Sequence, residues 1–420
     1  MKKRRTILFL VALLSLATSP FLHQETAVDE RAALRDLAPE TTFSGKGGAP
    51  PHYRAGQDLV AFNSYDVTQS IRGYAGPIKV LVVLGDDGRI KGIKLLSHRE
   101  TKNYVHYMES PAYLGRFIGK SVFDRFEVDR DIDGITRATV SVEALAKTVR
   151  ESSRAVALNA FGLQAGAGQA NEAGNWSWAW YAVVLVFGTV GYLLTRRDRL
   201  LRLRDLSLAA GIIVIGLYLA SPFSLLHVYN LALLRPSSSE LWYVIVGSTV
   251  LSLFIAGRFY CGWLCPFGAL SELIARLPTR KWTVPPEQDD RWRGFKHVLL
   301  AVVTAVVFLS GRVDHGNYEA YITLFAFHGN LFAWTLLALS LLANLRVPRF
   351  WCRYLCPVAA LAAVLSRRDP AYVSMPDCPM GNKPNPETGE CIRCNRCYHP
   401  KYGNGTGGGE APSLFPGNVG

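Results

Sequence analysis

The sequence predicts an α+β domain outside the membrane, then an all-α polytopic membrane domain, then a small cysteine-rich tail in the cytoplasm. Three observations predict these parts. Two β-branched apolar runs separated by a Gly-Asp-Asp-Gly turn lie in the first half of the chain. Apolar runs long enough to cross a bilayer follow, since a spanning helix needs about 20 such residues. All eight cysteines come late in the chain, in patterned groups.

Length and charge limit the class of protein. The chain has 420 residues and a formal net charge of +13, and this length is room for more than one domain. A basic balance is typical of nucleic-acid binding, but here the arginine clusters flank apolar runs, which indicates a membrane protein. No helix-turn-helix or zinc-finger spacing occurs. We therefore expect the lipid bilayer as a partner and no direct nucleic-acid binding.

The first segment, 1–24, reads as a signal peptide or an uncleaved anchor. Met1-Lys-Lys-Arg-Arg is followed by a short apolar stretch from Ile7 to Ala17, which is the order of charge and apolarity in such leaders. The following segment, 25–170, is too broken by charge to span a bilayer. It is predicted to be a folded domain outside the cytoplasm.

Within 25–170, two elements are predicted. Ile78–Leu84 and Ile90–Leu96 are rich in β-branched residues, and Gly85-Asp-Asp-Gly88 joins them; this pattern predicts a β-hairpin. Val142–Ala157 has apolar residues at helical spacing. Gly162–Gly174 is rich in small residues and reads as a linker.

The membrane domain, 177–366, contains five predicted spans. They are 177–195, 206–226, 241–260, 295–312 and 331–346. Arginine clusters follow the first, third and fifth spans, whereas the loops 227–240 and 313–330 hold only Arg235. Basic loops stay in the cytoplasm, so we expect a multi-pass protein of the inner (cytoplasmic) membrane. The tail, 367–402, then lies inside, and the Gly-rich end, 403–420, is predicted to be disordered.

The tail carries the ligand count of one cluster. Cys391, Cys394 and Cys397 follow one another at steps of three, and Cys378 supplies a fourth thiol across the intervening loop. Four thiolates hold a [4Fe–4S] cluster. A zinc site is the alternative, but zinc ribbons use two Cys-x-x-Cys knuckles and this tail has a single triple run. The spacing favours iron–sulfur and indicates an electron carrier.

A second cysteine pattern occurs twice. The copies are Cys261-Gly-Trp-Leu-Cys265-Pro266 and Cys352-Arg-Tyr-Leu-Cys356-Pro357. If each helix continues through the motif, cysteines four apart share a face, and the proline ends the helix just after the second cysteine. Two such helix ends side by side would present four thiolates to one centre. Buried packing cysteines are the alternative, and whether the site holds a cluster, another metal or a redox thiol pair stays open.

Four histidines lie at predicted helix ends or loops: His227, His297, His315 and His328. Two of them could ligate a haem. No pair shares a helix at ligand spacing, so the pattern favours interfacial polar residues instead.

The outer domain ends in Asp133-Gly-Ile-Thr136-Arg-Ala138-Thr139, which composition alone would read as a short turn. This segment resembles the Asp-x-x-Ser/Thr-Gly-Ala-Thr motif of FMN-binding domains in the Rnf, Nqr and NosR proteins, with Arg137 at the position of the glycine. The resemblance implies FMN bound covalently to Thr139 through a phosphoester bond that a flavin transferase makes. The residues that it assigns to flavin binding are Thr139, Asp133, Gly134, Thr136, Ala138, His98, Glu100 and Thr101.

The membrane half resembles the NosR/NirI family. Cys261–Leu270 and Cys352–Pro357 match the family's repeated motif, and the resemblance extends over roughly 70–400. It implies an extracytoplasmic FMN domain, a ferredoxin-like cytoplasmic tail and electron transfer rather than a stand-alone enzyme. Family tails usually hold two clusters, and this one has cysteines for one.

The resemblance also implies a biological setting, namely nitrous oxide reduction or a related anaerobic respiratory chain. The electron donor would be quinol or a cytoplasmic reductant, and the acceptor would be nitrous oxide reductase or its maturation factors. A redox-sensing regulator of respiratory gene expression is an alternative, as is an electron donor for metalloenzyme maturation.

Overall fold

The structure is a computed structural model. It describes residues 29–73, 77–98, 108–128, 131–132, 139–164, 176–198, 201–234, 237, 239–311, 313–316, 318–327, 329–366, 378–381 and 389–398. The chain divides into two compact units. One unit is His23–Trp176 with Leu226–Trp242, and the other is Met1–Leu22, Ser177–Leu225 and Tyr243–Gly420.

An antiparallel sheet organises the first unit. Its strands are β1 (Tyr53–Ala55), β2 (Leu59–Asn63), β3 (Ile78–Gly85) and β4 (Ile90–His98), in the order β1-β2-β3-β4. The predicted hairpin is confirmed as β3–β4, with Val82 paired to Ile93. Gly88 lies in the connecting turn with φ of 72°, a backbone conformation that glycine adopts without steric strain.

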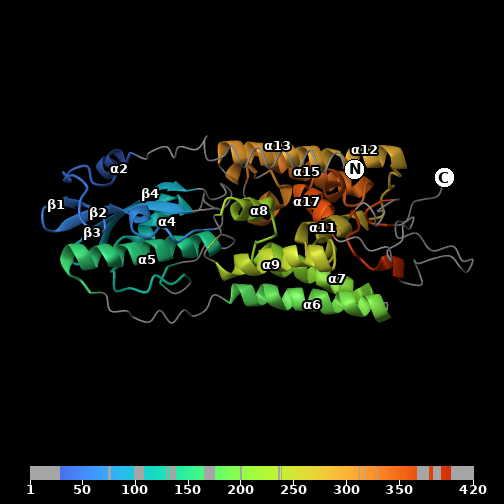
Figure 1. Cartoon of the computed structure of the whole chain (residues 1–420), viewed down its shortest axis with the longest axis horizontal. Helices are drawn as coiled ribbons and strands as arrows, with labels where there is room; N and C mark the ends of the chain where they lie inside the picture. The colour runs from blue at the N-terminus through green and yellow to red at the C-terminus, as the bar shows by residue number, and fades with distance from the viewer. Residues whose placement is uncertain are drawn as a thin grey trace, which may run out of the picture. The chain divides into compact units, whose positions relative to one another are not determined.

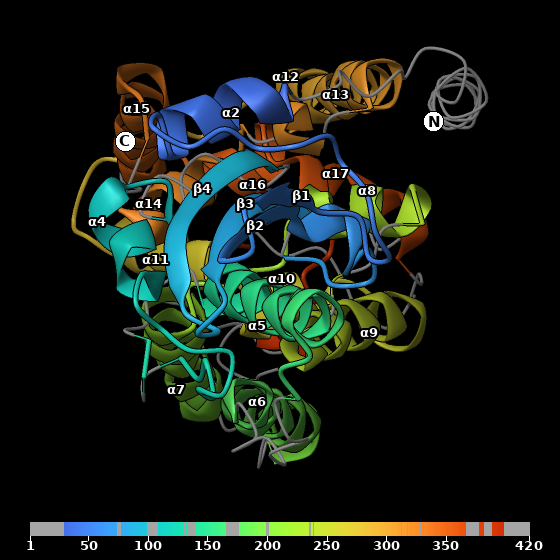
Figure 2. The same ribbon diagram turned by 90° about the vertical axis from the view of Figure 1, so that its left-hand side faces the viewer.

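Helices cover both faces of this sheet (Figure 2). The helix α2 (Glu30–Leu37) packs on β3 and β4, and α5 (Thr139–Phe161) packs on β3. Strand β3 is buried on both faces as a result, and Val80 to Val83 are each at most 3% exposed. The predicted helix Val142–Ala157 is confirmed within α5, which extends it at both ends.

The second unit is helical, and its main helices overlap the five predicted apolar runs (Figure 1). They are α6 (Ser177–Asp198), α7 (Leu201–Ala210) continued by the π-helix η3 (Gly211–Tyr218), α9 (Glu240–Ile255), α13 (Phe295–Ser310) and α15 (Leu331–Arg346). Among the described residues two helical stretches, Ser177–Thr195 and Pro286–Ser310, are long and apolar enough to cross a membrane. A third qualifies if the short helix α14 (Ala320–Ala326) and α15, bent by 104°, count as one span.

The run 206–226 differs from the prediction. Its helix ends at Tyr218, and Ala220 adopts a left-handed conformation with φ of 46°, which ends helical hydrogen bonding. The remaining elements are short. They are α4 (Pro111–Leu114), α8 (Leu225–Ala232), α10 (Phe259–Trp263), α11 (Pro266–Ala275), α12 (Pro286–Arg293), α14 (Ala320–Ala326), α16 (Phe350–Tyr354), α17 (Pro357–Leu365) and the 3₁₀ turns η1 (Ser64–Asp66), η2 (Gly115–Phe117), η4 (Val313–Gly316) and η6 (Arg396–Tyr398).

Candidate redox site

The two Cys-x-x-x-Cys-Pro motifs fold in the same way. In each, a five-residue helix, α10 or α16, ends two residues before the second cysteine, and the next helix, α11 or α17, begins at the proline. Cys265 has φ, ψ of −63°, 115°, and Cys356 has −66°, 117°. The sequence repeat is therefore also a structural repeat.

The expectation that one helix continues through each motif is wrong. Proline disfavours helical backbone in the residue before it, so Cys265 and Cys356 are extended and cap the next helix. Their Sγ atoms accept hydrogen bonds from the amides of Gly268 and Ala359, each at 3.4 Å. The second cysteine of each pair therefore lies at a helix N-terminus, where backbone N–H groups favour a thiolate.

The two repeats bring their cysteines into one neighbourhood. Burial raises the pKa of the Cys265 thiol, and negative charge on Cys261 and Cys352 raises it further. Burial likewise raises the pKa of Cys356, with Cys352 and Cys261 adding to the effect. These four cysteines, which we call the pair quartet, are therefore electrostatic neighbours although about 90 residues separate the motifs.

The tail cysteines form a second group, the tail quartet: Cys378, Cys391, Cys394 and Cys397. Burial raises the pKa of Cys391 to about 12, and Cys394 and Cys397 contribute. Burial also raises the pKa of Cys378, again with Cys394 and Cys391. Cys394 packs with Met380 and Ile392 in a small apolar cluster, against which Cys378 and Cys261 lie. Cys261 is therefore the point at which the two quartets meet.

The chemistry of these donors fits iron–sulfur ligation. Buried thiols with raised pKa values stay protonated, unless a metal ion displaces the proton and binds the thiolate. Within the described part of the chain, no three Cys, His, Asp or Glu side chains converge as ligands of a single metal ion. A cubane cluster binds each thiolate to a different iron and so needs a wider set of sulfurs.

Buried positive charge surrounds both quartets. The buried cations in this region, among the residues that the structure describes, are Arg204, Arg258, Arg293, Lys296, Arg349, Arg353, Arg393 and Arg396. The buried carboxylates that contact them are Glu272, Asp289 and Glu390. Among the described residues of this region, cations therefore outnumber carboxylates, and buried charge without a counter-charge is strongly unfavourable. Clusters held by thiolates are anions and would supply further negative charge.

Glu272 is the centre of one charge network. Its two carboxylate oxygens accept bidentate hydrogen bonds from Arg204, both at 2.7 Å. Arg349 and Arg396 also donate to it, each at 2.8 Å. Arg396 immediately precedes Cys397, so the hydrogen bond to Glu272 connects the tail to the helix α11.

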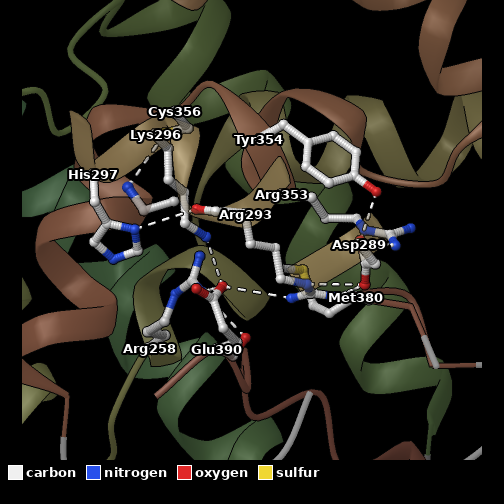
Figure 3. Close-up of polar contacts among 11 residues, drawn as sticks. Arg258, Asp289, Arg293, Lys296, His297, Arg353, Tyr354, Cys356, Met380 and Glu390 are labelled. Atoms are coloured by element: carbon white, nitrogen blue, oxygen red, sulfur yellow. Dashed lines mark hydrogen bonds and ion pairs between the residues drawn. The ribbon is translucent and has the colours of Figure 1, made fainter. Parts of the chain in front are cut away.

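Glu390 and Asp289 centre the second network (Figure 3). The Glu390 carboxylate accepts hydrogen bonds from Lys296 at 2.7 Å and Arg258 at 2.9 Å. Burial raises the pKa of Glu390, but Lys296 and Arg258 outweigh burial and hold it at about 2. Asp289 accepts from Arg293 at 2.8 Å and Arg353 at 2.7 Å, and Arg293 also donates to the carbonyl of Met380.

The predicted flavin residues lie mostly outside the described residues. This holds for Asp133, Gly134, Thr136 and Ala138, and also for Glu100 and Thr101. The backbone of Thr139 is described and begins α5. His98 ends β4, and its Nε2 lies 2.7 Å from Glu109.

Of the four candidate haem histidines, the three that the structure describes each contact a different residue and do not form a pair of the kind that ligates a haem. The His227 ring lies against Trp242, and His297 Nδ1 lies 3.2 Å from the Arg293 carbonyl. His315 lies against Ser310, and His328 is outside the described residues. The buried carboxylates Glu272, Asp289 and Glu390 were not predicted from the sequence. For Glu272, the sequence does contain a signal, namely a carboxylate within the apolar segment Leu270-Ser-Glu272-Leu-Ile.

Comparison with known proteins identifies two domains. Residues 73–153 match the FMN-binding domain family, and residues 240–285 and 327–371 match a 4Fe-4S binding domain family. The second match contains all four cysteines of the pair quartet and ends before the tail quartet. No solved structure is similar to the chain.

Three relatives illustrate the similarity. The chain is 32% identical to the uncharacterised protein MJ0749 of Methanocaldococcus jannaschii over 34% of this chain and 61% of that protein. It is 33% identical to NirI of Paracoccus denitrificans over 37% of this chain and 26% of NirI. It is 30% identical to the regulatory protein NosR of Pseudomonas aeruginosa over 49% of this chain and 34% of NosR. The chain thus spans less than two thirds of each relative. The predicted resemblance to NosR and NirI is confirmed.

Proposed function

We propose that this NosR/NirI-like chain, which combines an FMN-binding domain with a 4Fe-4S binding domain, transfers electrons in the inner membrane between flavin and iron–sulfur centres. The observation that carries the proposal is the meeting of the two cysteine quartets at Cys261. Adjacent centres in a buried, charge-compensated setting are suited to passing single electrons. The chain would be an electron-transfer protein rather than a stand-alone enzyme.

The two quartets have different ligand roles in this proposal. Cys378, Cys391, Cys394 and Cys397 would hold one [4Fe–4S] cluster, and the pair quartet would hold a second centre. An iron–sulfur cluster accepts and releases one electron at a time. The chain supplies the thiolates, excludes water from them and surrounds them with cationic side chains.

The proposed topology has five spans, with 25–170 outside and the tail inside. Two features support it. The segment Leu226–Trp242 belongs to the same compact unit as the FMN-binding domain, and Arg72 Nη1 donates to the Leu234 carbonyl at 3.2 Å. A loop on the outer side of the membrane is expected to pack with a domain on that same side, as Leu226–Trp242 packs with the FMN-binding domain.

The surface of α13 supports the same topology. Val298, Val302, Val306 and Leu309 are each at least 45% exposed, and their spacing puts them on one helix face. Such an exposed apolar stripe is suited to contact with lipid.

The proposed flavin site is at Thr139, through covalent attachment by a flavin transferase. Support comes from the position of Thr139 as the first residue of the 23-residue helix α5. A phosphoester there would lie where unpaired backbone N–H groups and the helix dipole stabilise negative charge. The flavin accepts and donates electrons, whereas the chain holds its phosphate.

The proposed setting is nitrous oxide reduction or a related anaerobic respiratory pathway. The donor would be quinol or a cytoplasmic reductant, and the acceptor an extracytoplasmic partner such as nitrous oxide reductase or its maturation factors. The relative NosR is a regulatory protein, which favours redox-sensing regulation as the second candidate. Supply of electrons for metalloenzyme maturation is the third.

Reduction of the flavin from the cytoplasmic side of membrane vesicles tests the proposal. A variant with Cys261, Cys265, Cys352 and Cys356 all changed to Ser should retain flavin and the tail cluster but lose this reduction. Single variants should look like the quadruple variant, because residues that act as one unit are not additive. Normal flavin reduction in the quadruple variant would mean that these cysteines only pack.

A further inference from the structure

Two arginines occupy equivalent positions in the two repeats. Arg258 lies three residues before Cys261, and Arg349 lies three residues before Cys352. Both side chains are completely buried. Their backbones differ, because Arg349 is left-handed with φ of 53° whereas Arg258 has φ of −75°. The two guanidinium groups therefore make different contacts.

All three nitrogens of the Arg349 guanidinium donate hydrogen bonds within the protein. Its Nε and Nη2 donate to Glu272 at 3.2 and 2.8 Å, and its Nη1 donates to the Cys261 carbonyl at 2.9 Å. Every nitrogen of this side chain thus has a partner within the fold. Arg349 has the contacts of a structural residue that joins the two repeats.

Only one nitrogen of the Arg258 guanidinium, Nη1, donates hydrogen bonds to Glu390. Its Nη1 donates to the Glu390 carboxylate at 2.9 Å and to the Glu390 carbonyl at 3.1 Å. Its Nε and Nη2 are buried and have no hydrogen-bond partner among the described residues. Leaving a buried donor unpaired costs about 1–3 kcal/mol, and more for a charged group. Two such donors on one side chain require an explanation.

The neighbours of Arg258 indicate what these donors serve. Cys261 and Cys352, one from each repeat, are electrostatic partners of its guanidinium, as is Glu390, the residue before Cys391, and the Cys261 sulfur is also within reach of a hydrogen bond from Arg258. Arg258 therefore lies between the pair quartet and the tail quartet. Of the two equivalent arginines, it is the one with N–H groups left over on the side of the cysteines.

We propose that Arg258 donates hydrogen bonds from Nε and Nη2 to the sulfur of the centre held by the pair quartet and thereby sets the reduction potential of that centre. This inference rests on the proposed function, which assigns an iron–sulfur centre to these four cysteines. Net charge and hydrogen bonds to sulfur are among the factors that set such potentials. One-electron reduction adds a negative charge, so a buried guanidinium stabilises the reduced form.

The test is a redox titration of the anaerobically purified full chain, followed by electron paramagnetic resonance. Arg258→Gln removes the charge and most donors, and should lower the midpoint potential of the pair centre by about 59 mV or more, a tenfold change for a one-electron couple. Arg258→Lys keeps the charge but not the planar set of donors, and should give a smaller shift in the same direction. Arg291→Gln is the control, because it makes the same change at an exposed arginine of α12.

The outcomes separate this inference from the proposed function. Iron and acid-labile sulfide are measured on every variant, and a Cys397→Ser background leaves the pair centre as the single cluster. If Arg258→Gln does not fold, Arg258→Lys decides the question. Loaded Arg258 variants with the wild-type potential would overturn the role of Arg258. Wild-type iron in Cys261→Ser would instead overturn the pair centre itself.

Discussion

Gly262, in the first repeat, lies directly against Ile392 in the cysteine-rich tail. The carbonyl oxygen of Ile392 occupies the position that a Cβ at residue 262 would need. The equivalent residue of the second repeat is Arg353, whose side chain reaches Asp289 instead. The tail is therefore seated on the first repeat through a contact that only glycine permits.

Gly262→Ala should displace the tail from this seat. Overpacking of this kind costs about 1–3 kcal/mol, and here the obstructing atom belongs to the backbone. We expect lower iron and acid-labile sulfide per chain after anaerobic purification, with flavin unchanged. Gly247→Ala in α9 is the matched control, because a Cβ there meets nothing within 4 Å. Full iron content in Gly262→Ala would show that the tail is not seated in this way.

Glu272→Gln should strongly destabilise the helical unit. The substitution leaves Arg204, Arg349 and Arg396 buried around a neutral amide, and removal of one partner from a buried ion pair costs about 3–5 kcal/mol. The measurement is thermal unfolding of the full chain in detergent. Asp205→Asn, which removes an exposed partner of Arg276, should change stability by less than about 1 kcal/mol. Equal effects of the two variants would contradict a central role for Glu272.

The tail cysteines should act together as cluster ligands. Cys391→Ser, Cys394→Ser or Cys397→Ser should each lose the iron and sulfide of one cluster while flavin stays bound, because three thiolates leave one iron without its protein ligand. Cys378→Ser should behave in the same way if it is the fourth ligand. Metal analysis of protein kept strictly anaerobic checks this, and zinc in place of iron would refute the assignment.

Thr139→Ala should abolish covalent flavin. The hydroxyl oxygen that forms the phosphoester is absent in alanine, so co-expression with a flavin transferase should give no fluorescent band on a denaturing gel. Thr136→Ala keeps the attachment oxygen and should weaken the band without removing it. Intact-mass measurement of the wild-type chain is decisive, since a mass without added FMN would leave only non-covalent binding.

The FMN-binding unit should lose part of its stability in acid through Glu30. Burial raises the pKa of Glu30, but hydrogen bonds from Lys46, Asn63 and Tyr53 outweigh burial and lower it below 4.5. A lowered folded-state pKa contributes stability that is complete above pH 4.5 and is lost as pH falls through the folded value. The difference in melting temperature between wild type and Glu30→Gln should be constant near neutrality and shrink below pH 4.5. A difference that does not change with pH would exclude this contribution.

Much of the architecture could be predicted from local patterns. The hairpin β3–β4 follows from two β-branched runs around a Gly-Asp-Asp-Gly turn, and α5 from helical spacing after Val142. The strands β1 and β2 were not predicted, because three and five residues without polar/apolar alternation carry too weak a signal. The strand β2 forms by pairing with β3, and β1 forms by pairing in turn with β2.

The role of the basic residues shows a further limit. The arginine bias between the predicted spans indicates membrane orientation. The structure buries Arg204, Arg349 and Arg353 from these same clusters in ion pairs with Glu272 and Asp289. Spacing along the chain cannot distinguish a cytoplasmic loop arginine from a buried one, since the partner carboxylate is distant in sequence.

The sequence by itself determined the cysteine pattern, with its grouping into two pairs and a tail set, and predicted the main helices of the second unit. These are local properties, set by residue identity and by periods of two, three or four residues. Only the tertiary structure decided that the two pairs converge, that Cys261 packs against the apolar cluster of Met380, Ile392 and Cys394, and that Arg258, unlike Arg349, keeps donors without a partner among the described residues. The physical reason is that convergence, burial and hydrogen-bond satisfaction depend on contacts between segments more than 60 residues apart, which no local pattern encodes.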